Sequence, residues 1–349
     1  MTTTPFRKRH ARKRPTLQLS NPLPDRRLAS IVICNHNYER YLRAALDSAL
    51  AQTYRPLEIV VIDDGSTDGS RDLLLEYQDR VHVIFKSNGG QPSAVNAGFR
   101  ECRGEIVFLL DADDVFEPVK VARVVEIFER NPDAGWVFHE LDYIDGRGAD
   151  LPLQRLPDRR HVRAVMRRRN RYREFARIDL REHFADGGRL PYACPAFSAL
   201  SFRRSTLDAI LPMPEDIARA GDEFPKFASI ALFPGIHLGE PLARQRIHTT
   251  NAASFRDSGF EEAIRFLKTA YHLRHRYGHI APSTDKWFAS SFGRILGSGG
   301  KHAAFSNEES RRYLKDYFGP MTWVRQAPRI ALHATRARLA RRGQSAPRH

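Results

Sequence analysis

Three aspartates stand at the end of a short apolar stretch of this 349-residue chain. The stretch runs from Ile106 to Leu110, and Asp111, Asp113 and Asp114 come next. An uninterrupted apolar run of this length predicts a strand that is buried on both faces. Because a buried carboxylate is costly, carboxylates at the end of such a strand must reach solvent, a cation or hydrogen-bond donors. Asp111 and Asp113 alternate along an extended chain and point the same way, so they could bind one divalent cation together with a diphosphate.

A plainer role for Asp113 or Asp114 is to cap the helix that we predict over residues 118–130, which carries Pro118 in its first turn. A second acidic strand end favours the chemical interpretation. The predicted strand 58–62 ends in Asp63 and Asp64, which open a Gly- and Ser-rich turn. Two acidic strand ends that face one crevice predict a nucleotide site, with one carboxylate for the base or ribose and another for a metal.

Alternating strands and helices place both acidic ends at one edge of a sheet. Apolar runs predict strands at 29–34, 58–62, 81–85 and 106–110, and helical periodicity predicts helices at 41–51, through 73–77 and at 94–99. This βαβαβ order over residues 29–130 predicts a mostly parallel, doubly wound α/β sheet. Right-handed crossovers bring the strand ends at Asp63 and Asp111 to the same edge.

The rest of the chain is less regular. We predict short strands at 135–139, into Phe202 and at 236–238, and a helix from residue 221 through Ala231 for which Asp222 is an N-cap in the simplest interpretation. The last ninety residues are predicted to be helical and basic, with a break at 297–300. The stretch 325–342 is either a solvated terminal helix or a basic amphipathic helix on a membrane surface.

The charge of the chain is unusual. Hydrophobic residues at 42% and charged residues at 28% are typical of a soluble globular protein, but a formal net charge of +15 predicts attraction to nucleic acid, an anionic membrane or a phosphorylated substrate. Cys34, Cys102 and Cys194 have no ligand spacing, which argues against a disulfide framework or a zinc site. With no secretory signal and no spanning apolar run, we expect a cytoplasmic protein, with any membrane contact peripheral on the cytosolic face.

Two segments carry much of this charge. Residues 1–27 form a polar arm with a basic block, which is either a solvated leader or an electrostatic contact with acidic lipid or nucleic acid. Eleven arginines lie between Arg155 and Arg181. They form either a solvated helical face or a site for something anionic, because a dense run of one sign repels itself and the guanidinium fork suits phosphate.

The motifs occur together in a specific order: Ser30-Ile-Val-Ile33, Asn37-Tyr38, Ser48 through Tyr54, Glu58 through Asp68, Asn88-Gly-Gly-Gln91, Asn96-Ala-Gly98 and Phe108 through Asp114. This series closely resembles the opening of family 2 glycosyltransferases of the Asp-x-Asp type. A weaker likeness extends to Asp222 and to Arg246-Ile-His248. The resemblance implies a GT-A fold, which is a Rossmann-like, doubly wound mixed sheet. It implies a nucleotide-sugar-binding half at 28–135 and an acceptor-binding half at 136–256, followed here by a helical basic extension at 257–349.

The resemblance also implies roles for single residues. The family transfers a sugar from a nucleotide diphosphate donor, most often UDP-linked, to a hydroxyl acceptor with inversion. Carried over by position, the nucleotide contacts would be Asn37, Asp63, Asp64 (base), Asn96, Asp111 (ribose) and Ala112. Asp113 would ligate Mn²⁺ or Mg²⁺, with His248 as a second ligand and Arg246 near the diphosphate. Asp222 would be the general base, with Glu223 as its rival, because this pair reads Asp-Glu instead of the commoner Glu-Asp.

Another departure is Cys34-Asn-His-Asn37, where the family usually has Pro-Thr-Tyr-Asn, so the contacts to the base are expected to differ. A nucleotidyltransferase also uses a Rossmann-like sheet, but its Gly-rich loop with a basic residue is missing near the first strand. A non-catalytic nucleic-acid or anionic-surface binding protein would explain the charge, yet the basic residues lie largely outside the Asp-bearing half, so nucleic acid is not expected. We therefore expect a hexosyltransferase-type enzyme of cell-surface polysaccharide or glycoconjugate synthesis, with a glycan, lipid-linked or anionic acceptor.

Overall fold

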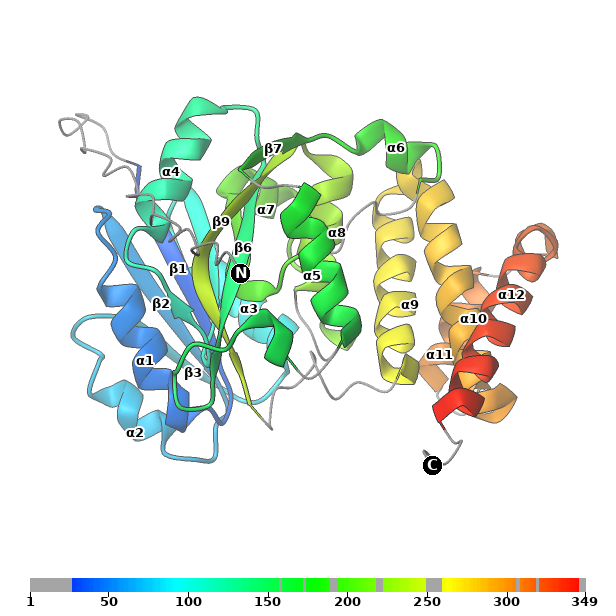
Figure 1. Cartoon of the computed structure of the whole chain (residues 1–349), viewed down its shortest axis with the longest axis horizontal. Coiled ribbons are helices and arrows are strands. Elements are labelled where there is room, and N and C mark those ends of the chain that lie inside the picture. Colours follow the sequence, from blue (N-terminus) through cyan, green and yellow to red (C-terminus); the bar gives the residue numbers. More distant parts are fainter. Residues whose placement is uncertain are drawn as a thin grey trace, which may run out of the picture.

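The computed structural model describes residues 27–156, 159–171, 174–188, 194–217, 222–248, 259–305, 308–317 and 320–344. Most of the basic arm predicted at 1–27 therefore lies outside the described residues. Within the described parts, helices cover both faces of one large mixed sheet, and the helices of the C-terminal region stack beside it (Figure 1). This arrangement confirms the predicted α/β sheet and the helical C-terminal region.

The strands are β1 (Ala29–Asn35), β2 (Leu57–Asp64), β3 (His82–Lys86), β4 (Ile106–Asp111), β5 (Val115–Phe116), β6 (Trp136–Asp145), β7 (Phe175–Ile178), β8 (Leu200–Arg203) and β9 (Gly235–Ile247). The α-helices are α1 (Glu39–Leu50), α2 (Ser70–Leu75), α3 (Gln91–Glu101), α4 (Lys120–Arg130), α5 (Arg159–Arg171), α6 (Arg181–Ala185), α7 (Arg204–Ile210), α8 (Glu223–Leu232), α9 (Gly259–Arg276), α10 (Ala281–Phe305), α11 (Glu308–Tyr317) and α12 (Pro320–Gln344).

The sheet brings the acidic strand ends together. Its order is β3-β2-β1-β4-β8-β6-β9-β5, with β7 also paired to β9. The strands β1 to β4 are parallel, and in the ladders of β1 Asn35 lies opposite Asp63 while Cys34 lies opposite Asp111. The predicted convergence of the two acidic ends at one sheet edge is therefore confirmed.

Alternation along the strands builds a core on each face of the sheet. Ile31 and Ile33 of β1 pack with α1, α2 and α4 on one face, and Val32 packs with α3, α7 and α8 on the other. Every residue of β1 is buried, as an apolar run between two neighbouring strands predicts. The sheet changes direction at β8, which pairs antiparallel with both β4 and β6, so the halves predicted at 28–135 and 136–256 share one continuous sheet.

The C-terminal helices have a core of their own, in which Leu267 of α9, Phe288 of α10 and Tyr317 of α11 are buried. The break predicted at 297–300 is wrong, because α10 runs without interruption from Ala281 to Phe305. The physical reason is close packing: a Cβ on Gly297 would lie 2.4 Å from the backbone oxygen of Ala334 in α12. The glycine lets two helix backbones approach, and it does not end the helix.

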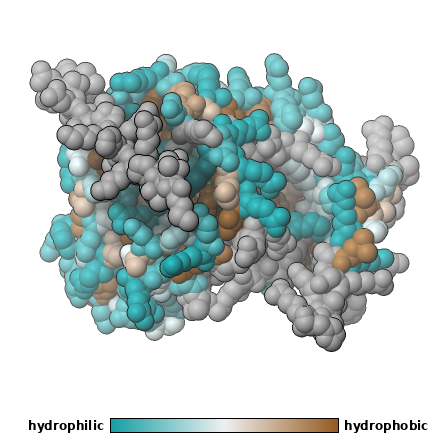
Figure 2. Space-filling model, in the orientation of Figure 1, coloured by the Kyte–Doolittle hydropathy of each residue, from teal (hydrophilic) through white to brown (hydrophobic). Residues whose placement is uncertain are grey.

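The stretch predicted as a terminal helix at 325–342 lies within α12. Ile330 and Ala334 are buried, whereas Leu332 and Leu339 are 46% and 62% exposed. Figure 2 shows a largely hydrophilic face, with apolar atoms at the right over the C-terminal helices. One side of α12 is therefore used for packing within the protein, and the other side faces solvent.

The arginine-rich segment is partly neutralised by the protein itself. Arg168 of α5 is buried and donates two hydrogen bonds to the Glu140 carboxylate, from Nε at 2.6 Å and from Nη2 at 2.9 Å. Burial alone would raise the pKa of Glu140, but hydrogen bonds from His237 and Arg168 lower it to about 2. Arg177 pairs with Asp133 and Arg181 with Asp179. Of the arginines in this run, Arg173 lies outside the described residues.

We expect Arg168→Met to lower the free energy of unfolding by about 3–5 kcal/mol, because it leaves the buried Glu140 carboxylate without its main counter-charge. The matched control is Arg167→Met in the same helix, where the exposed side chain should change stability by no more than about 0.5 kcal/mol. Urea unfolding of both variants measures the difference. Equal effects would mean that the Arg168–Glu140 pair does not stabilise the fold.

Candidate active site

The carboxylates of Asp111, Asp113 and Asp114 gather in a tight turn at the end of β4. Ligand atoms of the three lie within 4.8 Å of one another, and the turn is closed by a hydrogen bond of 3.1 Å from the Asp114 N–H to the backbone oxygen of Asp111. Burial raises the pKa of Asp111 well above its usual range, and repulsion from Asp113, Asp114 and Asp222 raises it further. Three close carboxylates with little solvent are stable only if a proton or a cation offsets their charge.

Asp114 has an unused oxygen. Its Oδ1 accepts a 2.8 Å hydrogen bond from the backbone N–H of Arg246, but within the described residues nothing donates to the buried Oδ2. Burial, reinforced by Asp113, raises the pKa of Asp114 to about 8. The helix-capping role considered for Asp113 and Asp114 is wrong, because α4 begins at Lys120 with Val119 at its N-cap and has no side-chain capping bond.

His248 completes the acidic cluster from the far end of the sheet. It follows β9, and its Nε2 lies 2.9 Å from Oδ2 of Asp113. The rings of Tyr41 and Tyr38 hold the imidazole, with centroid distances of 4.6 Å and 5.9 Å. Arg246 supports the turn by donating from Nε to the backbone oxygen of Asp113 at 2.8 Å. The two predicted metal ligands are therefore neighbours, although they are far apart in the sequence.

These residues fit a divalent cation. Carboxylate oxygens are the preferred ligands of Mg²⁺ and Mn²⁺, and an imidazole nitrogen is compatible with Mn²⁺. The buried Oδ2 of Asp114 is a free ligand position, and a cation would relieve the repulsion that raises the pKa of Asp111. Asp111, Asp113, Asp114 and His248 would hold the ion.

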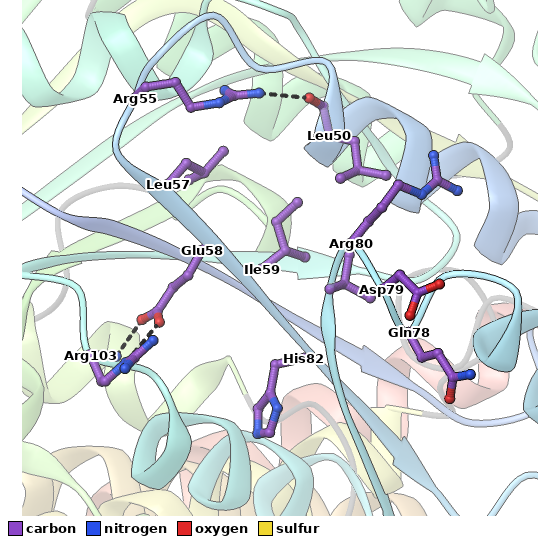
Figure 3. Close-up of a pocket in the computed structure, with 11 residues that line it drawn as sticks. Leu50, Arg55, Leu57, Glu58, Ile59, Gln78, Asp79, Arg80, His82 and Arg103 are labelled. Atoms are coloured by element: carbon purple, nitrogen blue, oxygen red, sulfur yellow. Dashed lines mark hydrogen bonds and ion pairs between the residues drawn. The ribbon is translucent and has the colours of Figure 1, made fainter.

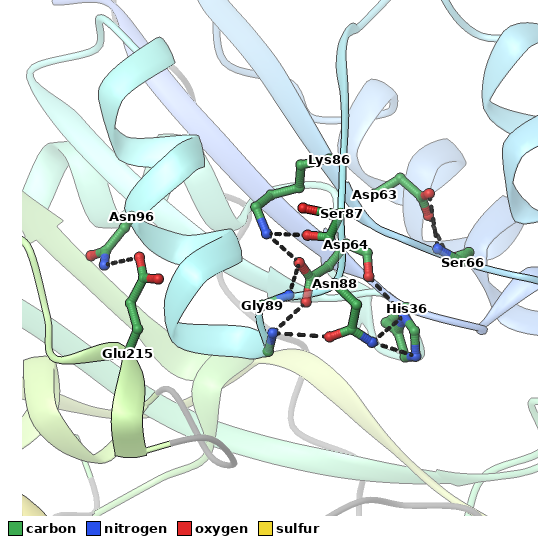
Figure 4. A network of polar contacts seen from close by, with 11 residues as sticks. His36, Asp63, Asp64, Ser66, Lys86, Ser87, Asn88, Gly89, Asn96 and Glu215 are labelled. Carbon is green, nitrogen blue, oxygen red and sulfur yellow. Dashed lines mark hydrogen bonds and ion pairs between the residues drawn. The ribbon is translucent and has the colours of Figure 1, made fainter.

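Asp64 holds the loop that leads into α3 (Figure 4). Its Oδ1 accepts hydrogen bonds from Lys86 Nζ at 2.6 Å and from the Gly89 N–H at 2.9 Å, and its Oδ2 accepts from the Gly90 N–H at 2.7 Å. The turn after β2 approaches this loop closely, since a Cβ on Gly65, which has a φ of +73°, would lie 2.7 Å from the Asn88 nitrogen. Asp64 therefore fixes the conformation of the loop between β3 and α3, at the carboxyl end of β2.

Four other predicted nucleotide contacts lie at or just after the carboxyl ends of β1, β2 and β4. Asp63 accepts a 2.9 Å hydrogen bond from Asn35 Nδ2, and Asp111 accepts one of 2.9 Å from Gln91 Nε2. Ala112 is buried within the acidic turn. Asn37, with a φ of +59°, accepts a 2.7 Å hydrogen bond from the Thr67 N–H.

Asn96 is engaged elsewhere. Its Nδ2 donates to the Met213 oxygen at 2.9 Å and to Glu215 at 3.1 Å, and its Oδ1 accepts from the Met213 N–H at 2.8 Å. Figure 4 shows Asn96 and Glu215 set apart from the network around Asp64. Asn96 therefore ties α3 to the chain segment that precedes α8, and its role as a nucleotide contact stays a prediction.

Asp222 and Glu223 face different partners, and Gly221 before them lies outside the described residues. Asp222 forms an ion pair with Lys226 Nζ at 2.6 Å, makes no capping hydrogen bond, and is close enough to Asp111 to raise its pKa. Glu223 instead pairs with Arg265 of α9 at 3.5 Å. Asp222 is thus the carboxylate on the side of the acidic cluster, and Glu223 points toward the C-terminal helices.

Glu223 should make stability depend on pH. Burial raises its pKa to about 8 in the folded protein, despite Arg265, so the folded state holds this proton more tightly than the unfolded state. Folding stability is then lost as the pH rises from the unfolded pKa through 8. We expect Glu223→Gln to gain stability relative to the wild type by up to about 1.4 kcal/mol per pH unit between pH 5 and 8.

Chemical unfolding at several pH values measures this difference. The exposed Glu129→Gln is the control for the substitution itself. A difference between Glu223→Gln and the wild type that does not change with pH would contradict the expectation.

The cavity in Figure 3 lies at the opposite edge of the sheet, where β2 and β3 begin. Its volume is about 520 Å³, and its walls include Leu57, Ile59 and Arg80. Arg103 on its rim is paired with Glu58 at 3.3 Å. None of the predicted site residues lines it, so it is separate from the acidic cluster.

Sequence reasoning named the acidic cluster but missed several of its supports. Gln91 donates a hydrogen bond to Asp111, and the ring of Tyr38 packs against His248. Ser198 accepts a 3.0 Å hydrogen bond from the Asp111 N–H across the sheet. The sequence pattern around Ser198 gave no signal for this contact.

Comparisons with known proteins agree with this geometry. A family model described as "Glycosyl transferase family 2" matches residues 30–203. An uncharacterized glycosyltransferase of Nostoc sp. is 39% identical over 188 residues, which are 53% of this chain and 53% of that protein. Chondroitin synthase of Escherichia coli is 36% identical over 124 residues, which are 35% of this chain and 18% of that protein. The chain spans about half the length, or less, of the curated relatives it matches.

Solved structures share the fold. S. aureus TarS in complex with UDP superposes with a TM-score of 0.55 at 16% identity, covering 91% of this chain and 93% of that chain. The complex of TarS with UDP-GlcNAc gives 0.54 at 14% identity, covering 90% and 92%. With its Asp-x-Asp turn at the edge of a mixed sheet and a family match that spans β1 to β8, this chain belongs to glycosyltransferase family 2 and has the GT-A fold.

Proposed function

We propose that the protein is an inverting, metal-dependent glycosyltransferase that moves a sugar from a UDP-linked donor to a hydroxyl acceptor. One observation carries the proposal: Asp111, Asp113 and Asp114 form a cluster with His248 at one edge of the sheet, and the Asp222 carboxylate is near enough to raise the pKa of Asp111. The UDP and UDP-GlcNAc complexes of the structural neighbour TarS support a UDP-linked donor.

The donor would lie along the carboxyl ends of β1, β2 and β4, where open α/β sheets bind ligands. Asp111 would contact the ribose and Asp64 the base, with the remaining nucleotide contacts from Asn37, Asp63, Asn96 and Ala112. A divalent ion held at the acidic cluster would offset the negative charge that develops on the leaving diphosphate. Residues 28–135 would thus form the donor half of the site.

The acceptor would approach from residues 136–256, where Asp222 lies. Inversion needs one displacement, so the protein has to supply only a base on the acceptor side and no nucleophile. Asp222 is suited to take the proton of the acceptor hydroxyl, because it is near enough to Asp111 to raise its pKa, while Glu223 pairs with Arg265 of α9.

The acceptor would be a glycan, a lipid-linked molecule or an anionic molecule, and the enzyme would work at the cytosolic membrane face in polysaccharide or glycoconjugate synthesis. The net charge of +15 supports an anionic acceptor or contact with an anionic membrane surface. Arg167 of α5 is exposed and available to such an acceptor. No helix that the structure describes is both long and apolar enough to cross a bilayer.

Calorimetric titration with UDP and with GDP, each with and without Mn²⁺ or Mg²⁺, tests the proposal. UDP should bind only when the metal is present, and UDP-GlcNAc should be hydrolysed slowly when water takes the place of the acceptor. Preference for GDP would change the donor class. If neither UDP nor GDP binds in the presence of Mn²⁺ or of Mg²⁺, the proposed function is overturned.

A further inference from the structure

One helix of the C-terminal region contacts the chain segment that leads to Asp222. Near the end of α9, Arg276 donates from Nη1 to the backbone oxygens of Ile210 at 2.7 Å and Pro212 at 2.9 Å. The next residue, Tyr277, donates its hydroxyl to the Ala209 oxygen at 3.0 Å. The first residues of the segment 209–217 are thus held through their backbone oxygens. The donors are side chains of the last turn of α9 and of the residue after it.

One to two turns earlier, α9 holds the far end of the same segment. His272 Nε2 lies 2.9 Å from Oδ1 of Asp216, and Lys268 Nζ donates to the Asp216 backbone oxygen at 2.6 Å. Tyr313 of α11 donates its hydroxyl to the other oxygen of this carboxylate. Asp216 is only partly exposed, and three side chains from two C-terminal helices converge on it.

The first turn of α8 receives a third contact from the same side of α9. Arg265 pairs with Glu223 at 3.5 Å, and Glu223 directly follows Asp222. Residues 265, 268, 272 and 276 are spaced by three and four, so they form one stripe along the helix. That stripe runs beside residues 209–217 and reaches the start of α8.

We propose that α9 is a positioning element for Asp222. Arg265, Lys268 and His272 hold the 209–217 segment and the start of α8, and so set the distance between the Asp222 carboxylate and the acidic cluster. This inference rests on the proposed function, because it takes Asp222 as the acceptor-side base. It assigns the C-terminal helices a part in catalysis that the family match, which ends at residue 203, does not cover.

The donor half holds the segment from the other side. Asn96 of α3 binds both the N–H and the oxygen of Met213, and it also contacts Glu215. Between these two sets of contacts the segment has little freedom to shift. A misplacement of about 1 Å at a reacting group can cost on the order of a hundredfold in rate, so loosening one set should be visible in turnover.

The test uses the full chain with His272→Ala, Tyr313→Phe and the conservative His272→Gln, whose amide can still donate to Asp216. In Mn²⁺ we expect His272→Ala to lower kcat for UDP-GlcNAc hydrolysis by about tenfold or more, with the Kd for UDP unchanged within about twofold. Hydrogen exchange of the amides at 213–217 should become faster. His272→Gln should restore most of the rate, and the exposed His279→Ala is the matched control.

A double-mutant cycle with Asp222→Asn decides whether the effect passes through Asp222. In that background His272→Ala should cost little more, since residues that act as a unit are not additive. Fully additive losses, or an unchanged kcat in both His272→Ala and Tyr313→Phe while UDP still binds, would overturn the inference alone. A wild-type protein that neither binds UDP nor hydrolyses UDP-GlcNAc would remove the proposed function, and the inference with it.

Discussion

Asp113→Asn is expected to abolish metal-dependent UDP binding and to lower the rate of sugar transfer about a thousandfold. The substitution removes one negative charge from the cluster and replaces the oxygen that lies 2.9 Å from His248 Nε2. A divalent ion at a leaving diphosphate supplies several kcal/mol, and each 1.36 kcal/mol is a factor of about ten in rate. Calorimetry with UDP and Mn²⁺, together with UDP-GlcNAc hydrolysis, measures both effects.

The same variant separates a ligand role from a folding role. Because Asp111, Asp113 and Asp114 repel one another, Asp113→Asn without metal should be at least as stable as the wild type. His248→Gln should weaken metal binding more mildly, by about 10- to 100-fold. The exposed Asp72→Asn in α2 is the control for a lost surface charge. Mn²⁺-dependent UDP binding that survives in Asp113→Asn would rule out the cluster as the metal site.

Asp222→Asn is expected to lower the transfer rate by about 10²- to 10⁴-fold, the usual contribution of a general base, while the Kd for UDP stays unchanged. Asparagine keeps the size of the side chain but cannot take a proton from the acceptor hydroxyl. Measuring kcat for hydrolysis beside the Kd for UDP separates this loss from damage to the donor site. The variant should therefore bind UDP normally and react slowly.

Glu223→Gln is the matched comparison, since it changes the neighbouring carboxylate in the same way. Its carboxylate pairs with Arg265, so its removal should reduce the rate much less than Asp222→Asn does. The reverse order, with Glu223→Gln inactive and Asp222→Asn active, would move the base to Glu223. It would also show that the Asp-Glu order of this pair exchanges the two roles.

The part of the fold that the sequence predicts well is the part with local signals. Each of β1, β2 and β4 is an apolar run closed by polar residues, so Asp63 and Asp111 could be placed at one sheet edge from chain order and crossover handedness alone. The antiparallel insertion of β8 between β4 and β6 has no such signal, because Leu200–Arg203 is short and its partners lie far away in the chain.

The site divides in the same way. The aspartate cluster is contiguous and its spacing points to a cation, whereas the approach of Asp222 to Asp111 depends on how α8 packs. The arginine run is compatible with either a solvated face or a site for an anionic ligand. Arg168 does neither, because it forms a buried ion pair with Glu140 of β6. Gly297 could not be told from a helix breaker, since its partner backbone in α12 comes later in the chain.

The strand β9 has a consequence for the order of folding. It pairs with β5, β6 and β7, and it ends in the residues that contact Asp113 and Asp114 from more than 130 positions away. Contacts of such sequence separation form late, whereas the β1–β4 crossovers close short loops. The acidic turn is therefore expected to form first as an uncompensated cluster of negative charge. Docking of β9 would then bring Arg246 and His248 to it, so the proposed metal site would be completed only in this late step.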